Sequence, residues 1–99
     1  MHSISWAQPA IDDLLEMVDF FNEKQEPEVG ADLVARLYRS AERLAAFPHS
    51  GRKGLVPDTR GLVLPHLPFF LVHQVSQSHI AILRVMHSSR LWTSQDSEK

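Results

Sequence analysis

The chain changes from a strand-like to a helix-like hydrophobic pattern within its first third. Residues 3–6 alternate polar and apolar side chains and stop before Pro9, which predicts a short first strand. In residues 9–23 the apolar positions recur at a helical spacing, so this segment is predicted to be an amphipathic helix. The stripe expected to face the core is formed by Ile11, Leu14, Leu15, Val18 and Phe21.

A second helix is predicted from near Pro27 to a point before Pro48, because the residue that precedes a proline is disfavoured in the α conformation. Its apolar stripe is Val29, Leu33, Leu37, Ala41 and Leu44. The short link between the two helices predicts a helical hairpin. Residues 47–54 follow, with two glycines and the basic pair Arg52 and Lys53, and predict an exposed loop of the kind that often carries function.

Three more strands are predicted at residues 60–64, 69–75 and 79–87, and the short turn between the last two makes them an antiparallel hairpin. The order β-α-α-β-β-β predicts an α+β fold in which the helical hairpin packs on one face of a mainly antiparallel sheet. Residues 1–92 are expected to form one domain, and the polar residues 93–99 a flexible tail.

The last predicted strand combines apolar and polar groups. Strand alternation predicts two sets of side chains on opposite faces: Ala81, Leu83, Val85 and His87 on one, and Ile80, Ile82, Arg84 and Met86 on the other. Arg84 is expected to have a carboxylate partner, the usual arrangement for a charge within an apolar strand, or else to lie on an open face of the sheet. His87 lies where the strand ends, and is either a satisfied structural histidine or a functional acid, base or anion contact.

Composition narrows the possible classes of protein. The chain has no cysteine, which excludes disulfides and thiolate catalysis, and it has neither a secretion signal nor a long apolar stretch, so a cytoplasmic protein without a membrane segment is expected. The net charge is −2, but acidic residues dominate up to Asp32 and basic residues from Arg36 to Arg90. A fold that keeps these parts separate could present a basic face to an anionic partner.

Known catalytic and metal-binding patterns are missing. The six histidines include no helical pair at metal-ligand spacing and no His-Glu-x-x-His motif, so no metal site is expected. The sequence also lacks a nucleophile-elbow serine, a P-loop and a dinucleotide fingerprint, so no cofactor is expected.

Four stretches, at residues 10–14, 44–52, 60–63 and 82–92, resemble in their order and spacing the RelE/ParE superfamily of bacterial toxins from type II toxin–antitoxin modules. The likeness is greatest to the ParE-like, plasmid-stabilisation branch. It implies a small cytoplasmic toxin that causes growth arrest and is held inactive in a hetero-oligomer by an antitoxin that wraps around the helices and sheet.

The family resemblance implies one of two mechanisms. RelE-like toxins enter the ribosome and cleave mRNA without a metal, whereas ParE-like toxins poison DNA gyrase and are not known to catalyse a reaction. RelE-type nucleases resemble one another in an arginine on the strand where this chain has Phe70, and often have a tyrosine where it has His73. These departures favour the ParE-like reading, in which the chain is not an enzyme.

Each mechanism assigns roles to particular residues. In the gyrase reading, Arg52, Lys53, Arg90 and Trp92 are predicted to contact the target. In the alternative, a ribosome-dependent mRNA endoribonuclease, His87 would act as acid or base while Arg60, Arg90 and Lys53 would stabilise charge on the scissile phosphate.

Overall fold

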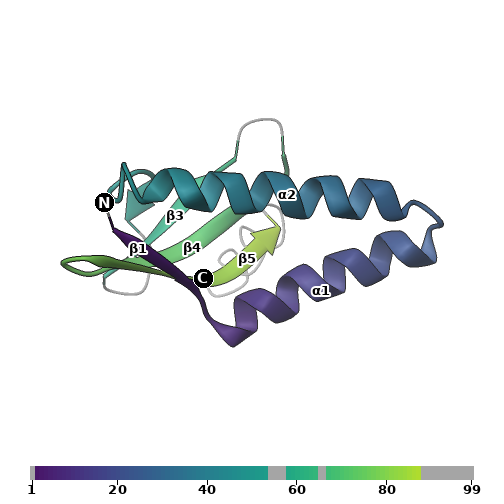
Figure 1. The fold of residues 1–99 in the computed structure, drawn as a ribbon, viewed down its shortest axis with the longest axis horizontal. Helices are drawn as coiled ribbons and strands as arrows, with labels where there is room; N and C mark the ends of the chain where they lie inside the picture. The colour runs from purple at the N-terminus through teal and green to yellow at the C-terminus, as the bar shows by residue number, and fades with distance from the viewer. Residues whose placement is uncertain (1, 54–57, 65–66, 88–99) are drawn as a thin grey trace, which may run out of the picture.

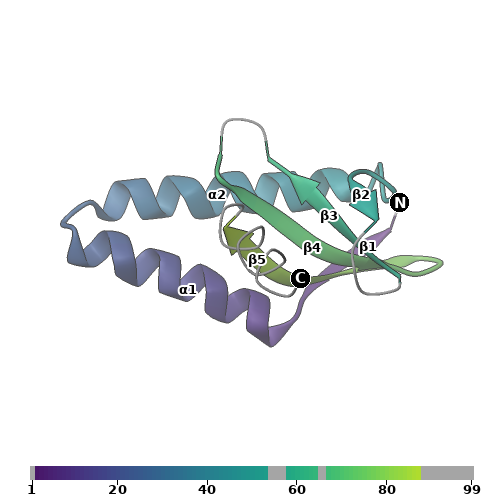
Figure 2. The same cartoon turned by 180° about the vertical axis from the view of Figure 1, so that it is seen from behind.

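A helical hairpin packs on one face of a five-stranded sheet in the computed structural model, which describes residues 2–53, 58–64 and 67–87 (Figure 1). The elements are β1 (Ser3–Trp6), α1 (Gln8–Glu23), α2 (Pro27–Leu44), β2 (Arg52–Lys53), β3 (Thr59–Val63), β4 (Phe69–Val75) and β5 (His79–His87). Seen from behind, the strands lie in front of both helices (Figure 2). The predicted α+β class is therefore confirmed, with one added strand, β2.

The strand order is β1-β5-β4-β3-β2, so β1 and β2 form the two edges of the sheet. β1 runs parallel to β5, and all other neighbours are antiparallel. The hairpin of β4 and β5 has the predicted bounds. Large apolar side chains from α2 and the central strands fill the core: Leu37, Leu44, Leu71, Ile80 and Ile82.

The buried face of α1 is rotated around the helix from the predicted stripe. Ala10 and Met17 are buried, whereas Leu15 is 56% exposed and Ile11 is 36% exposed. Apolar residues lie side by side at positions 10 and 11 and at 14 and 15, so a helical period alone cannot choose between the two faces. The prediction was wrong for Ile11 and Leu15.

The two helices approach closely where α2 has a glycine. A Cβ atom on Gly30 would lie 3.2 Å from the Cβ atom of Phe21 and 3.6 Å from the Cα atom of Val18. The link after α1 and the flanking ends of both helices project beyond the sheet (Figure 1). Phe20 and Val29 are both exposed near this end.

β5 contains a bulge that changes which side chains face the helices. Val72 is paired with Arg84 and the next residue, His73, with Ile82, so Leu83 is an extra residue on β5. Ile80 and Ile82 are buried before the bulge and Val85 after it. The predicted alternation, which put Val85 opposite to Ile82, was wrong because strand periodicity assumes an uninterrupted ladder.

Asp13 of α1 binds the part of β5 that β1 leaves open. The pairing of β1 with β5 ends at Trp6 and Ile82. Beyond it, the Val85 amide donates to Asp13 Oδ2 at 2.8 Å, and Arg84 donates through Nε to Oδ2 at 2.8 Å and through Nη2 to Oδ1 at 3.0 Å. The hydrogen bond with Asp13 raises the pKa of the Arg84 guanidinium. The predicted structural ion pair of Arg84 is confirmed.

Candidate target-binding surface

β2 presents two cations at an edge of the sheet. Arg52 is paired with Gly61 and Lys53 with Arg60, and both β2 side chains are exposed. The chain enters this strand through Gly51, which has φ of +89°. A Cβ atom on Gly51 would lie 2.5 Å from the Gly61 carbonyl oxygen, so only glycine allows this approach.

Arg60 holds the segment that precedes β2. Its Nη1 atom donates to the carbonyl oxygens of His49 at 3.0 Å and Gly51 at 3.3 Å. This predicted catalytic residue is partly buried and is bound to backbone of its own chain. Its charge is still next to Lys53 across the β2–β3 ladder, so it adds to the positive potential of the edge.

His87 lies at the other end of the sheet. It is exposed at the end of β5, and its ring meets Phe69 edge to face, with centroids 5.3 Å apart and planes at 79°. Arg60 is paired with His73 on β4, whereas His87 is paired with Phe69. His73 lies four positions after Phe69 on β4, or roughly 13 Å along the strand. The described residues thus do not bring His87 and Arg60 together, and the predicted Arg90 and Trp92 lie outside them.

His73 is fully buried in the central strand β4. Neither ring nitrogen has a hydrogen-bond partner among the described residues. Burial is the largest cause and lowers the pKa of His73, and the Arg60 guanidinium lowers it further; the nearby backbone of Leu71 and Pro48 has an opposite effect but does not meet hydrogen-bond geometry. The folded chain therefore favours the neutral imidazole.

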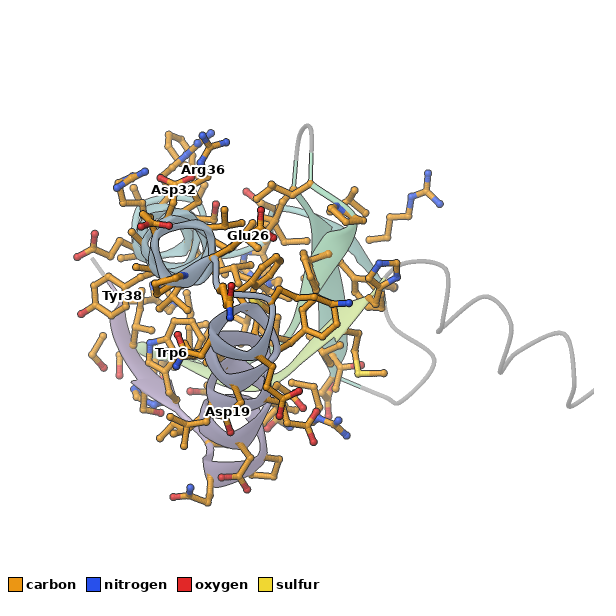
Figure 3. The ribbon with its side chains drawn as sticks, turned by 90° about the vertical axis from the view of Figure 1, so that its right-hand side faces the viewer. Trp6, Asp19, Glu26, Asp32, Arg36 and Tyr38 are labelled. Atoms are coloured by element: carbon orange, nitrogen blue, oxygen red, sulfur yellow. The ribbon has the colours of Figure 1, made fainter. Side chains whose placement is uncertain are left out.

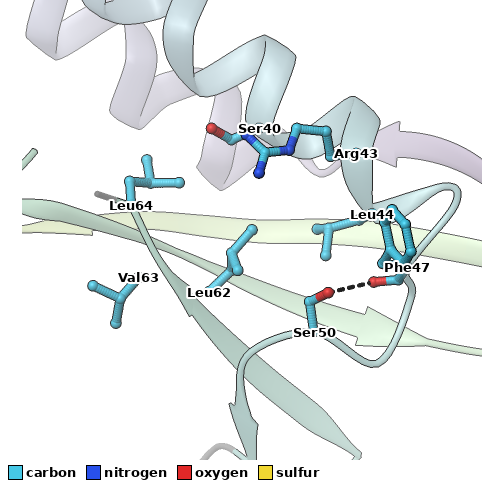
Figure 4. A pocket seen from close by; sticks show the side chains of 8 residues that line it. All are labelled: Ser40, Arg43, Leu44, Phe47, Ser50, Leu62, Val63 and Leu64. Carbon is cyan, nitrogen blue, oxygen red and sulfur yellow. Dashed lines mark hydrogen bonds between the residues drawn. The ribbon is translucent and has the colours of Figure 1, made fainter. Parts of the chain in front are cut away.

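A hollow between α2 and β3 lies next to the basic edge (Figure 4). Its volume is about 120 Å³ and it is lined by Ser40, Arg43, Leu44, Phe47, Ser50, Leu62, Val63 and Leu64. Phe47 is 67% exposed and Val63 is 61% exposed, which is unusual for large apolar side chains without a partner. The Ser50 hydroxyl donates to the Phe47 carbonyl at 2.8 Å and fixes the turn. The combination offers an apolar anchor site beside cations.

The sequence did not reveal this hollow, because helix, turn and strand each supply part of it. The available sequence signal was Phe47, an aromatic residue next to Pro48 in a turn-rich basic segment. Within the described ranges, salt bridges join Arg36 to Asp32 and Arg84 to Asp13, so the cations at the basic edge have no carboxylate partner there. Arg36 and Asp32 lie on the outer side of α2 (Figure 3).

Over the same described residues, neither helix is long and apolar enough to cross a membrane. Those residues also contain no group of three or more His, Asp or Glu side chains placed to hold a metal ion.

The helical hairpin and the order of its sheet define the toxin fold of the RelE/ParE class, as the resemblance predicted. The family model described as the ParE toxin of the type II toxin-antitoxin system, parDE, matches residues 4–92, and the chain belongs to this family. Y4kP, a candidate toxin of Sinorhizobium fredii (strain NBRC 101917 / NGR234), is 36% identical over 78 residues, which cover 79% of this chain and 80% of Y4kP. A solved structure of the chromosomal ParDE TA system from P. aeruginosa matches with a TM-score of 0.77 and 29% identity, over 88% of this chain and 96% of that one.

Proposed function

We propose that this ParE-family toxin poisons DNA gyrase by binding it, without catalysing a reaction, and that a cognate antitoxin neutralises it. The main support for the proposal is that His87 and Arg60, the groups expected to act on RNA, lie apart. Acid–base cleavage of RNA needs groups that converge on one phosphate. Here the β4 partners of His87 and Arg60 lie four positions apart, and Arg60 is engaged by two carbonyl groups.

Gyrase is proposed to contact the β2 edge and the neighbouring hollow. Arg52 and Lys53 would face acidic groups of the target, and Phe47 and Val63 would receive an apolar side chain. An apolar centre with a charged rim is the usual composition of a specific protein interface. Arg90 and Trp92 remain predicted members of this surface on the basis of the sequence.

The antitoxin is proposed to cover the helical hairpin. Large apolar side chains are exposed along it, namely Ile11, Leu15, Phe20 and Val29. Exposed apolar side chains on a soluble domain mark interaction sites, and a segment with apolar anchors could cover these. The helical period puts Ile11 and Leu15 on one flank of α1 and Phe20 on the other, with acidic residues between them, so the covering segment is expected to carry basic groups beside its anchors.

Induction of the toxin in growing cells separates the two mechanisms. A gyrase poison should trigger the DNA-damage response while translation continues, because gyrase is stalled on cleaved DNA. The measurement is a damage-reporter signal together with amino-acid incorporation over the first minutes after induction. Early arrest of translation with cleaved mRNA and no damage signal would instead support the endoribonuclease.

Antitoxin neutralisation can be tested apart from toxicity. Leu15→Glu puts a charge in the proposed antitoxin contact and should make co-expressed antitoxin less able to restore growth, while the toxin alone stays active. Gln77→Glu adds the same charge in the exposed turn between β4 and β5 and serves as the control. If the antitoxin still neutralises the Leu15→Glu toxin fully, the hairpin is not part of the antitoxin interface.

A further inference from the structure

The two edges of the sheet differ in their chemistry. β2 has two residues and both are charged, which discourages pairing with another strand. β1 has the sequence Ser-Ile-Ser-Trp and contains neither a charged residue nor a proline. Natural sheets normally protect their edges with such residues, and the sequence of β1 supplies none of them.

The hydrogen bonds of β1 identify the backbone groups that remain open. The amides of Ser3 and Ala7 donate to the β5 carbonyls of Ser78 and Ile82, at 3.0 and 2.8 Å. Backbone groups alternate along a strand, so the N–H and C=O groups of Ile4 and Trp6 point away from β5. The described part of the chain supplies no hydrogen bond to them.

A hollow of about 370 Å³ runs beside this edge, between β1 and the flank of α2, and is lined by His2, Ile4, Trp6, Tyr38, Ala41, Glu42 and Ala45. Trp6 and Tyr38 stack across it with centroids 6.0 Å apart and planes 6° apart (Figure 3). Tyr38 is nevertheless 52% exposed. A strand added to β1 would place alternate side chains in this hollow.

We propose that β1 is an interface with a second copy of this chain, paired antiparallel about a two-fold axis through Ser5. In this register Ile4 of each copy lies opposite Trp6 of the other. Each such pair exchanges both backbone hydrogen bonds, so every open group is used. The apolar side chains of both residues then meet on the helix side of one continuous sheet.

A second copy fits because β1 and the neighbouring side of α2 form a self-complementary surface. The His2 amide donates to the Ala45 carbonyl, and Trp6 stacks on Tyr38, so α2 runs antiparallel to β1. The two-fold axis therefore brings Glu42 of one copy to the level of Tyr38 of the other, an acceptor beside a hydroxyl donor. The charged β2 edge repels its own copies, so the association closes at a dimer.

Sedimentation of the purified chain over a range of concentrations tests this interface. Ile4→Pro removes one outward N–H and leaves the donors to β5 intact, a place where strands tolerate proline. Tyr38→Glu puts a second carboxylate at the level of Glu42 of the other copy. Each variant should weaken dimerisation by about tenfold or more. Arg39→Gln, with the same change in charge one residue away, should stay within about twofold.

Two results would overturn the proposal. One is a wild-type chain that remains monomeric up to the highest soluble concentration. The other is a dimer that neither variant weakens. If the chain is monomeric and the Ile4 and Trp6 amides become protected from hydrogen exchange only in complex with antitoxin, the edge belongs to that partner. None of these outcomes depends on whether gyrase is the target.

Discussion

At the scale of single residues, one carboxylate of α1 completes the ladder of β5. Asp13 is mostly buried, with 15% of its side chain exposed, whereas its partner Arg84 is 48% exposed. Asp13 also accepts from the Val85 amide. The carboxylate therefore contributes more than a surface ion pair, because its loss leaves a backbone donor without a partner.

Asp13→Ala is expected to destabilise the fold by about 1 to 3 kcal/mol, the range for an unsatisfied partly buried donor. Arg84→Ala should lower the free energy of unfolding by no more than about 1 kcal/mol, because an exposed ion pair contributes little. Urea denaturation of both variants measures the difference. Equal losses would mean that the bond to the Val85 amide adds nothing.

His73 makes the stability of the fold dependent on pH. Its pKa is lowered in the folded chain, chiefly by burial. The unfolded chain takes up a proton below about pH 6.5, the folded chain only at lower pH, so the unfolded state binds more protons in between. Stability is therefore complete above about pH 6.5 and falls as the pH is lowered through this window.

His73→Leu should remove this part of the pH dependence. Wild type is expected to lose up to about 1.4 kcal/mol per pH unit between about pH 6.5 and the lowered folded pKa. The measurement is urea denaturation at about pH 7.5 and about pH 5.5. His49→Gln changes an exposed histidine and is the control. An unchanged slope in His73→Leu would show that other groups cause the acid sensitivity.

At the scale of elements, a single glycine allows β2 to form. Gly51→Ala puts a methyl group against the Gly61 carbonyl and a side chain at φ of +89°. The variant should lose about 1 to 3 kcal/mol and release β2 from β3. Gly61→Ala is the matched control, because its Cβ atom would meet only the Phe70 ring, at 3.5 Å.

Hydrogen exchange of the β2 and β3 amides follows the release directly. Gly51→Ala should make these amides exchange faster, and Gly61→Ala should leave them close to wild type. Faster exchange in both variants, or in neither, would contradict the role assigned to Gly51.

The elements that could be predicted from the sequence are those with long patterns. β4 and β5 are runs of β-branched and aromatic residues on either side of a short turn, and their bounds were predicted correctly. β2 has two charged residues and no periodicity to detect. The bulge at Leu83 and the rotation of α1 depend on packing between elements, which a local pattern does not contain.

The candidate site was predictable only in part, for the same reason. The basic residues Arg52 and Lys53 stood out as charges in a turn-rich segment. The hollow beside them requires α2 and β3 to come together, so its apolar character was not visible along the chain. Arg84 was correctly predicted as structural because a charge in a central strand needs a partner.

At the scale of the whole molecule, the fold places the acidic first part of the sequence and the basic later part on two different surfaces. Acidic residues line the exposed side of α1, while cations gather where the end of α2 meets the β2 edge. The small net charge of −2 is therefore the sum of an acidic surface and a basic surface. The two surfaces therefore favour partners of different charge, a basic one at the hairpin and an acidic one at the basic edge.

The most direct test of gyrase poisoning at the basic edge is the amount of cleaved DNA that purified gyrase accumulates when this chain is added. Wild type should stabilise the cleaved complex, and the double variant Arg52→Glu, Lys53→Glu should require about tenfold more protein or greater for the same effect. Arg36→Glu reverses a cation outside this surface and should behave as wild type. If wild type produces no cleaved complex while a known gyrase poison does, or if the double variant remains fully active, the account is contradicted.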